Sequence, residues 1–415
     1  MLTKNKCLPL FRDTEAMSDS MKKYKVAWIQ NTLAPYTVPF FERLSQHPSI
    51  DLFAYFCTKT HKERKDAWGI LKSDKFNYTV LPGITVDSWG IIYHVNPAVI
   101  PKLIKGKYDV IVIGDCTNFT TQAAFITSKL LKTPVILHSE AIKSAQWFKG
   151  VKNIQRLLVK FINPLRKYII RKVDAVVALG TMCRDFHLEQ GAGAEKVFIA
   201  PDAIGNEMFM QQSSRLRKEK EKLKQQLDIN NKKVILYVGQ LIKRKGVRYL
   251  IEAYGELKRD YDDVCLMLVG DGPLRTELEE SCVKHYIKDV HFLGNKDYEE
   301  LPKYYSMADI FVLPTLEDIW GLVVNEAMAC GLPVITTKAA GCAVDLIIPG
   351  ENGFIVDEAN AGQLCSAIKG IILDEALARE MGEKSLEMVN SRWNINENVN
   401  GVVSAIEYAC GDGKR

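Results

Sequence analysis

The chain lacks the features that mark membrane-spanning and secreted proteins. No apolar run among its 415 residues reaches the roughly 18 residues that a helix needs to cross a bilayer. The first twenty residues have no long apolar core and no small-residue cleavage pattern, so they do not form a secretory signal peptide. We expect residues 1–20 to be a flexible tail before the first strand, and we expect the protein to be cytoplasmic.

Motifs for metal, disulfide, dinucleotide and nucleic-acid sites are also missing. None of the ten cysteines is paired as C-x-x-C, and Cys265 and Cys330 lie in apolar runs, which favours buried free thiols in a reducing compartment. The seven histidines form no H-E-x-x-H pattern, so we expect no metal and no other cofactor. Because no G-x-G-x-x-G follows a predicted strand, a dinucleotide-dependent dehydrogenase is excluded. No nucleic-acid-binding motif is present either.

Charge is unevenly divided between the two halves of the chain. Residues 1–210 contain 29 basic and 18 acidic residues, a net charge of +11, whereas the remainder has 26 and 32, a net charge of −6. One interpretation is chance variation between two solvated surfaces. The other is that the first half faces an anionic partner such as a membrane surface or a lipid phosphate.

Short apolar runs alternate with helical stretches along the chain, a pattern typical of parallel sheets with helical crossovers. In the first half the predicted strands are residues 25–31, 51–56, 108–115, 134–140, 173–180 and 196–203. In the second half they are residues 234–239, 264–270, 290–294, 309–314 and 332–337. The sequence therefore predicts two doubly wound, Rossmann-like α/β domains. Their expected bounds are an N-terminal domain at 21–212, a charged linker or exposed helix at 213–230, a C-terminal domain at 231–390, and a C-terminal helix at 391–415 that returns toward the N-terminal domain.

Glycines gather at the carboxyl ends of the predicted strands in the second half. They are Gly239, then Gly270 and Gly272 on either side of Asp271, then Gly294, and Gly321 in a later loop. Ligands of doubly wound sheets bind at this edge, where helix N-termini attract anions. Several glycine-bearing loops at successive strand ends favour a nucleotide or phosphate site.

Two carboxylates and a run of cations lie in the same half. Asp318 precedes a predicted helix and Glu326 lies on it, where carboxylates can accept hydrogen bonds from sugar hydroxyls; an N-capping acid and an ordinary helix residue are an equally good interpretation. Lys243, Arg244 and Lys245 occupy a loop between a strand and a helix. A solvated charge run explains such residues as well, but the helix start after them favours a role in neutralising a departing diphosphate.

Together these segments resemble the family-4 retaining glycosyltransferases, which have the GT-B fold of two Rossmann-like domains facing a cleft. The resemblance includes residues 238–254, 270–274, 313–337, 341–347 and 350–356, and is strongest over residues 230–357. It implies that Lys245 contacts the donor diphosphate, that Glu326 binds the donor ribose, and that Asp318 lies near the donor sugar, with Glu317 as the alternative first acid. Gln240 stands where the family usually has arginine, so Arg244 is the candidate replacement. The remaining donor-binding candidates are Gly239, Gly270, Gly272, Ile319, Trp320, Gly321, Leu322 and Val323.

The same resemblance assigns the acceptor to the N-terminal domain. The loop after the first strand has no glycine, unlike that of many family members, which leaves the acceptor class open. Asn31, Tyr36 and Asp115 are the acceptor-binding candidates from their loop positions. His138 matches the region where the family often has a histidine near the donor sugar, and a structural histidine is the competing interpretation.

The function implied is a metal-independent, retaining glycosyltransferase. We expect it to move sugar from a nucleotide-sugar donor to a glycan or lipid-linked acceptor in surface polysaccharide or glycoconjugate synthesis, with peripheral contact to an anionic membrane. An epimerase or hydrolase acting on nucleotide sugars, and a catalytically inactive nucleotide-sugar-binding subunit, are the alternatives.

Overall fold

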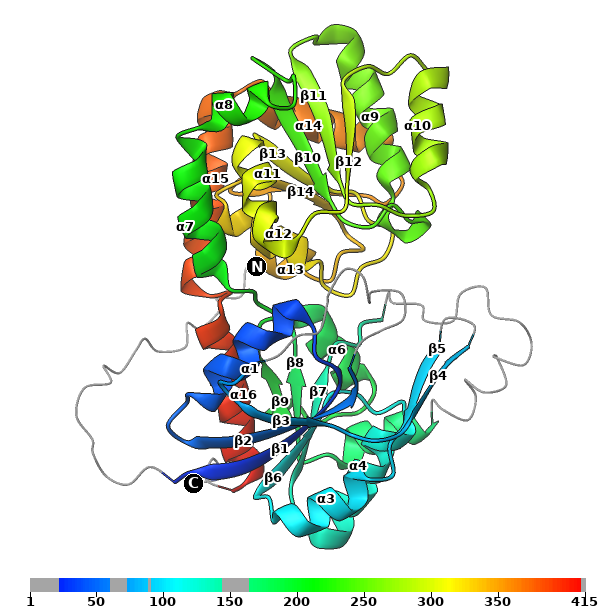
Figure 1. The fold of residues 1–415 in the computed structure, drawn as a ribbon, viewed down its shortest axis with the longest axis vertical. Coiled ribbons are helices and arrows are strands. Elements are labelled where there is room, and N and C mark those ends of the chain that lie inside the picture. The colour runs from blue at the N-terminus through cyan, green and yellow to red at the C-terminus, as the bar shows by residue number, and fades with distance from the viewer. Residues whose placement is uncertain (1–21, 60–72, 89–90, 144–163, 412–415) are drawn as a thin grey trace, which may run out of the picture.

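The computed structural model describes residues 22–59, 73–88, 91–143 and 164–411. The expected tail at residues 1–20 lies outside these ranges. Within them the chain forms two α/β domains that follow one another along the longest axis of the molecule (Figure 1).

The N-terminal domain is built on a seven-stranded parallel sheet with the order β3-β2-β1-β6-β7-β8-β9. Its strands are β1 (Tyr24–Thr32), β2 (Ile50–Thr58), β3 (Asn77–Val80), β6 (Val110–Ile113), β7 (Val135–Ser139), β8 (Ala175–Ala178) and β9 (Val197–Ile199). Its helices are α1 (Val38–Ser45), α3 (Val99–Gly106), α4 (Phe119–Leu131) and α6 (Thr181–Glu189), with short turns η1 (Pro35–Thr37) and η3 (Ala194–Lys196). A separate antiparallel hairpin, β4 (Ile84–Ser88) and β5 (Ile91–Val95), extends from one side of the domain (Figure 1).

The C-terminal domain contains a six-stranded parallel sheet with the order β12-β11-β10-β13-β14-β15. Its strands are β10 (Lys233–Val238), β11 (Val264–Val269), β12 (Val290–Gly294), β13 (Ile310–Leu313), β14 (Val334–Thr337) and β15 (Gly353–Val356). Its helices and turns are η4 (Lys243–Lys245), α9 (Val247–Asp260), α10 (Arg275–Lys284), η5 (Tyr298–Glu300), α11 (Leu301–Met307), α12 (Leu322–Ala329), α13 (Ala343–Leu346), α14 (Ala361–Ile372) and α15 (Glu375–Ser391).

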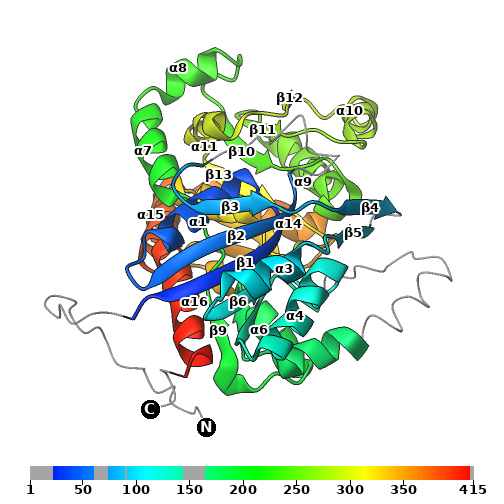
Figure 2. The ribbon, with the colours of Figure 1, turned by 60° about the horizontal axis from the view of Figure 1, so that its bottom comes forward.

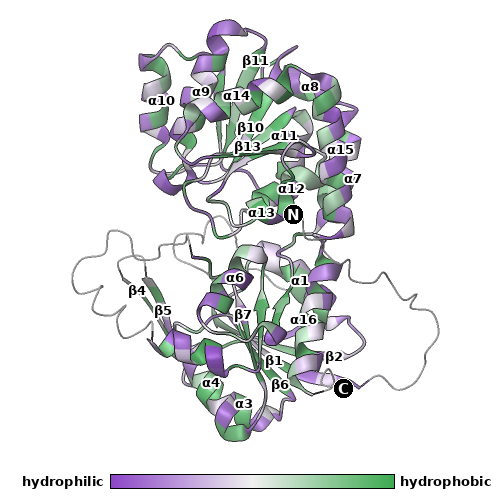
Figure 3. Ribbon diagram, turned by 180° about the vertical axis from the view of Figure 1, so that it is seen from behind, coloured by the Kyte–Doolittle hydropathy of each residue, from purple (hydrophilic) through white to green (hydrophobic). Residues whose placement is uncertain are grey.

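Helices cover both faces of each sheet, which explains why the strands are nearly continuous apolar runs. In the N-terminal domain, α1 lies over one buried core and α3 and α4 lie over the other (Figures 1 and 2). Hydrophobic strands run through the interior of both domains, and the helices around them carry both hydrophilic and hydrophobic residues (Figure 3). All eleven predicted strands are present, and the prediction of two doubly wound α/β domains is confirmed.

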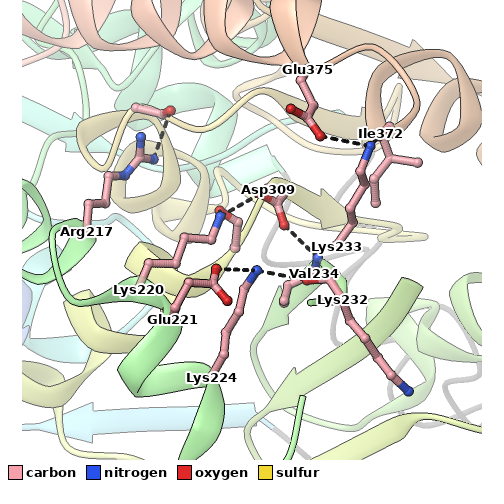
Figure 4. A network of polar contacts seen from close by, with 12 residues as sticks. Arg217, Lys220, Glu221, Lys224, Lys232, Lys233, Val234, Asp309, Ile372 and Glu375 are labelled. Atoms are coloured by element: carbon pink, nitrogen blue, oxygen red, sulfur yellow. Dashed lines mark hydrogen bonds and ion pairs between the residues drawn. The ribbon is translucent and has the colours of Figure 1, made fainter. Parts of the chain in front are cut away.

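The charged segment between the domains is a packed helical connection. The predicted boundary at residue 212 falls inside α7 (Asn206–Arg217), which together with α8 (Lys220–Gln225) contacts α11 of the C-terminal domain. The fully buried Phe209 belongs to that domain's core. The expectation of an exposed helix is wrong for two of its cations: Lys220 Nζ donates to Asp309 Oδ1 at 2.5 Å, and Lys224 is only 5% exposed with its Nζ bonded to the Lys232 carbonyl at 2.8 Å (Figure 4).

The last helix, α16 (Ile395–Ala409), lies against the N-terminal domain. It packs on α1 and on strands β7, β8 and β9, and its buried Val399, Val402 and Ile406 join one of that domain's two cores. The chain therefore crosses between the domains twice, through α7 and through the segment between α15 and α16 (Figure 1).

Candidate active site

Three strand ends in the C-terminal domain meet backbone to backbone. Gly239 N donates to the Val269 carbonyl and Gly270 N donates to the Gly294 carbonyl, both at 2.9 Å. A Cβ on Gly270 would lie 1.9 Å from the Gly239 carbonyl oxygen, and its φ of 132° disfavours any other residue. Gly270 is therefore required for the close packing of these strand ends, which brings their peptide groups together at one edge of the sheet.

The cationic loop at Lys243–Lys245 packs against the loop that follows β13. Gly246 has a φ of 65° and lies so close that a Cβ there would be 2.1 Å from the Pro314 carbonyl oxygen. Leu316 N donates to the Arg244 carbonyl at 2.7 Å, and the Thr315 hydroxyl donates to the same carbonyl at 3.0 Å. These bonds bring the basic loop and the acidic loop together at one sheet edge.

Lys245 and Asp318, 73 residues apart in sequence, form an ion pair. Their side chains are 12% and 11% exposed, and Arg244 Nη1 lies 4.0 Å from Asp318 Oδ1. Burial lowers the pKa of Lys245, while Asp318 opposes that shift and favours the charged ammonium. Of the two candidate first acids, Asp318 is the one whose carboxylate reaches the lysine; Glu317 instead accepts a 3.3 Å hydrogen bond from Arg244 through its backbone carbonyl.

Glu326 is a buried carboxyl group on α12, behind the helix start at Gly321. The Tyr305 hydroxyl donates to Glu326 Oε2 at 2.7 Å. Burial raises the pKa of Glu326 to about 7, because a charge is poorly solvated there, and the tyrosine hydrogen bond only partly offsets this. Near neutral pH the group can therefore be either a carboxylate that accepts two hydroxyl protons or an acid that donates one.

Trp320 and Gln240, two of the predicted donor-binding residues, differ in the exposure of their side chains. The Trp320 indole is 4% exposed, donates from Nε1 to Asn325 Oδ1 at 2.9 Å, and packs against Trp393 with ring centroids 5.5 Å apart. Only its backbone is left to contact a donor. Gln240 is exposed at the end of β10, and its carbonyl accepts a 2.8 Å hydrogen bond from the Tyr237 hydroxyl. Ile319, Leu322 and Val323 are half-buried beside α12.

In the N-terminal domain, Asn31 and Asp115 come together at the carboxyl ends of β1 and β6. Asn31 Nδ2 donates to Asp115 Oδ2 at 2.8 Å, and Asn118 Nδ2 donates to Asn31 Oδ1 and to both Asp115 oxygens at 2.9–3.1 Å. The Thr121 hydroxyl adds a 3.0 Å bond to Asp115. Tyr36, the third acceptor candidate, is half-buried in η1.

His138 is held in an apolar setting at the end of β7. Its ring centroid lies 5.1 Å from that of Trp28 and 6.4 Å from that of Phe40. The residue is 9% exposed, and burial lowers its pKa to about 4, so the imidazole is neutral at pH 7. Its buried Nδ1 has no hydrogen-bond partner within the described part of the chain. A neutral ring of this kind serves as a hydrogen-bonding group and not as a cation.

The carboxyl edges of the two sheets contact one another. Asp345, on α13 of the C-terminal domain, accepts from Thr181 N at 2.8 Å and from the Thr181 hydroxyl at 2.6 Å, so it caps helix α6 of the N-terminal domain. A Cβ on Gly180 would lie 2.4 Å from the Trp320 ring. Direct contacts between the two domains therefore join the candidate donor region to the candidate acceptor region.

Sequence reasoning missed the residues that support the site. Asn118 could have been identified, since an asparagine before a helical run is an N-cap signal, and its Oδ1 indeed accepts from Thr121 N at 3.1 Å. Asp345 lies within a motif that carried the resemblance, but its contact is made across the domains. Nothing in the sequence links Tyr305 to Glu326.

The nine cysteines in the described ranges are free and eight are buried. Across those same ranges no group of three His, Cys, Asp or Glu residues is arranged to hold a metal ion. No described helix combines the length and the apolar character that a membrane span requires.

Comparison with known proteins identifies one matching family model and several related proteins. Residues 219–388 match the family model of glycosyl transferases group 1. The chain is 32% identical over 152 residues to an uncharacterized glycosyltransferase of Methanocaldococcus jannaschii, covering 37% of this chain and 42% of that protein. It is 28% identical over 196 residues to the capsular polysaccharide biosynthesis glycosyltransferase CapM of Staphylococcus aureus, covering 47% and 50%. The aligned regions thus span half or less of these two relatives.

Among solved structures, HepE of Anabaena in complex with UDP superposes with a TM-score of 0.73 at 18% identity, covering 92% of this chain and 99% of that one. The predicted GT-B fold is confirmed.

Proposed function

We propose that the protein is a retaining glycosyltransferase that takes a sugar from a nucleotide-sugar donor held in the C-terminal domain. The observation that carries this proposal is the meeting of Lys245, Arg244 and Asp318 beside a glycine-lined sheet edge. Support comes from the group-1 family model over residues 219–388 and from the likeness of the fold to HepE, whose structure contains UDP.

The assignment of roles follows from charge. Lys245, with Arg244 beside it, neutralises the donor diphosphate, and the need is greatest as the sugar leaves and charge grows on that group. Glu326 accepts the ribose hydroxyls, and the α12 N-terminus offers peptide N–H groups to the phosphates. Asp318 lies beside the donor sugar. Because these cations can neutralise the diphosphate themselves, we propose that turnover needs no metal ion.

The acceptor binds on the N-terminal side, at the Asn31–Asp115–Asn118 cluster. Its carboxylate and amide groups suit the hydroxyls of a sugar. The reaction retains configuration by front-face attack, with the donor diphosphate taking the acceptor proton. We propose a glycan or lipid-linked acceptor in surface polysaccharide or glycoconjugate synthesis. We also propose a cytoplasmic location, because buried free thiols suit a reducing compartment.

A panel of nucleotide sugars tests the donor assignment. Wild-type protein should be protected against thermal unfolding by one or more of them, and the Glu326→Gln variant should be protected less by the same compound. Product analysis with candidate acceptors then separates transfer from hydrolysis or epimerisation. Equal protection of both proteins by every effective compound contradicts the proposed site.

A further inference from the structure

Exposed apolar side chains are concentrated on one part of the N-terminal domain. Of the fifteen large apolar side chains exposed in the described ranges, ten lie between residues 84 and 168. Single exposed apolar residues are normal on soluble proteins, but a cluster of them marks a contact surface. The five in the C-terminal domain are Val283, Tyr286, Val344, Ile348 and Leu373.

Two neighbouring helices provide the centre of this cluster. On α3, Ile100 and Ile104 are 36% and 52% exposed, although Val99 and Leu103 already serve the core. On the adjacent α4, Ile126 and Leu130 are 58% and 79% exposed. Each exposed pair is spaced i,i+4, so its members share one side of their helix. The core does not need these side chains.

The charge of the same helices has one sign. Helices α3 and α4 contain no acidic residue, and they carry Lys102, Lys105 and Lys129, with Lys107 and Lys132 directly after their ends. Lys129 pairs with Asp174 at 2.9 Å. Lys102, Lys105, Lys107 and Lys132 are exposed, and no ion pair is found for them within the described residues. We call Ile100, Ile104, Ile126, Leu130 and these four lysines the basic apolar face.

The β4–β5 hairpin links this face to the acceptor candidates. Ile84 and Val86 are 68% and 48% exposed, and the cross-strand partner of Val86 is Tyr93. Burial raises the pKa of Tyr93, and the negative charge of Asp115 raises it further. Strand β5 also contacts α4. The hairpin therefore lies beside α4, whose N-cap residue Asn118 bonds to Asp115.

We propose that the basic apolar face docks on an anionic lipid bilayer. The isoleucine and leucine side chains enter the boundary between headgroups and acyl chains, while the lysines contact lipid phosphates. Charge complementarity favours an anionic bilayer over a second copy of the chain, because two copies would bring like-charged lysines together. The inference rests on the proposed function in one respect: docking there brings a lipid-linked acceptor to the hairpin side of Asp115.

Vesicle flotation of the full-length protein tests the inference. We use phosphatidylcholine vesicles and vesicles of phosphatidylcholine mixed with phosphatidylglycerol, at low and high salt. Wild-type protein should favour the anionic vesicles by about tenfold or more, and salt should reduce that preference. The Ile104→Glu/Leu130→Glu double variant should lose most of the binding. The matched control is Val283→Glu/Tyr286→Glu, which adds the same charges at the C-terminal end of α10 and just after it in the C-terminal domain, and should bind as wild type does.

Two further readouts separate the possible failures. Thermal unfolding, with and without an effective nucleotide sugar, should be the same in both double variants as in wild type, so a loss of vesicle binding cannot be unfolding. Equal wild-type binding to neutral and anionic vesicles overturns the inference, as does equal loss in the α10 control. A dimer in sedimentation equilibrium that Ile104→Glu/Leu130→Glu dissociates, without vesicle binding by wild type, assigns the face to a second copy. In each of these cases intact donor protection leaves the proposed function standing.

Discussion

Replacing Asp318 with asparagine should strengthen the binding of a free nucleoside diphosphate. The lysine proposed to contact the donor diphosphate is already paired with a carboxylate, and both side chains are nearly nine-tenths buried. An incoming diphosphate has to compete with Asp318 for the Lys245 ammonium, and it also meets the negative charge of Asp318. Asparagine is nearly the same size but removes both obstacles.

The size of the effect follows from simple electrostatics. A unit charge about 6 Å from the incoming phosphate, at an effective dielectric constant of about 40, repels it by about 1.4 kcal/mol, or about tenfold in Kd. An opposing effect is present, because burial already lowers the pKa of Lys245 and Asp318 counteracts that shift. In Asp318→Asn the lysine pKa is lower still, so the gain in affinity should be largest at low pH and decline as pH rises.

Isothermal titration with UDP and with GDP measures this directly. We expect Asp318→Asn to bind the effective nucleotide about tenfold more tightly than wild type, and Lys245→Ala to bind it more weakly. The double variant should bind the nucleotide about tenfold more tightly than Lys245→Ala, because the repulsion between Asp318 and the phosphate does not need the lysine. Sugar transfer by Asp318→Asn should nevertheless fall, because product release slows and the carboxylate proposed to lie beside the donor sugar is gone. A nucleotide affinity in Asp318→Asn equal to or below that of wild type refutes the reasoning.

The remaining predictions concern turnover, pH and metal. Lys245→Ala should lower kcat by on the order of a hundredfold at saturating donor, whereas Glu326→Gln should raise the donor KM more than it lowers kcat, with circular dichroism confirming that both variants fold; near-normal kcat in Lys245→Ala moves the role to Arg244. Because the pKa of Glu326 is about 7 and ribose hydroxyls favour its ionised form, donor affinity should be lost as pH falls through about 7, and a Glu326→Gln profile with the same slope counts against this. Turnover should persist in EDTA; loss of activity that manganese or magnesium restores contradicts metal independence.

Local patterns were enough to locate eleven of the thirteen strands in the two sheets, but they missed β3 and β15 and misplaced a domain boundary. Each predicted strand is a short run of apolar residues that ends in polar residues or glycine. Strands of a parallel sheet are buried on both faces, so they have this pattern. The β4–β5 hairpin was missed because it stands outside the sheet, with Ile84 exposed where a core residue was the natural expectation. The boundary at residue 212 was misplaced because α7 is mostly polar, yet buries Phe209 completely.

The site was predictable where it depends on residue type and not where it depends on long-range contact. A lysine and an acid in loops that follow strands, with a second acid on the helix after one of them, are residue types that suit a phosphate and sugar hydroxyls, whatever their exact partners. Lys245 and Asp318 are 73 residues apart, and no sequence periodicity predicts that they pair. The hydrogen bond from Tyr305 cannot be predicted from the sequence either, although it opposes the burial-driven rise in the pKa of Glu326.

The placement of Trp320 connects the two domains to the donor loop. Its backbone belongs to the segment between Asp318 and the start of α12, while its ring contacts Trp393 and lies against Gly180 of the other domain. Asp345, which lies 25 residues after Trp320, caps α6 across the same boundary. A close-packed interface of this kind does not deform continuously, because packed side chains adopt discrete arrangements. Any shift of the loop between Asp318 and α12 must therefore move Trp320 and displace residues at the ends of β8 and α6. His138 lies at the same edge of that sheet.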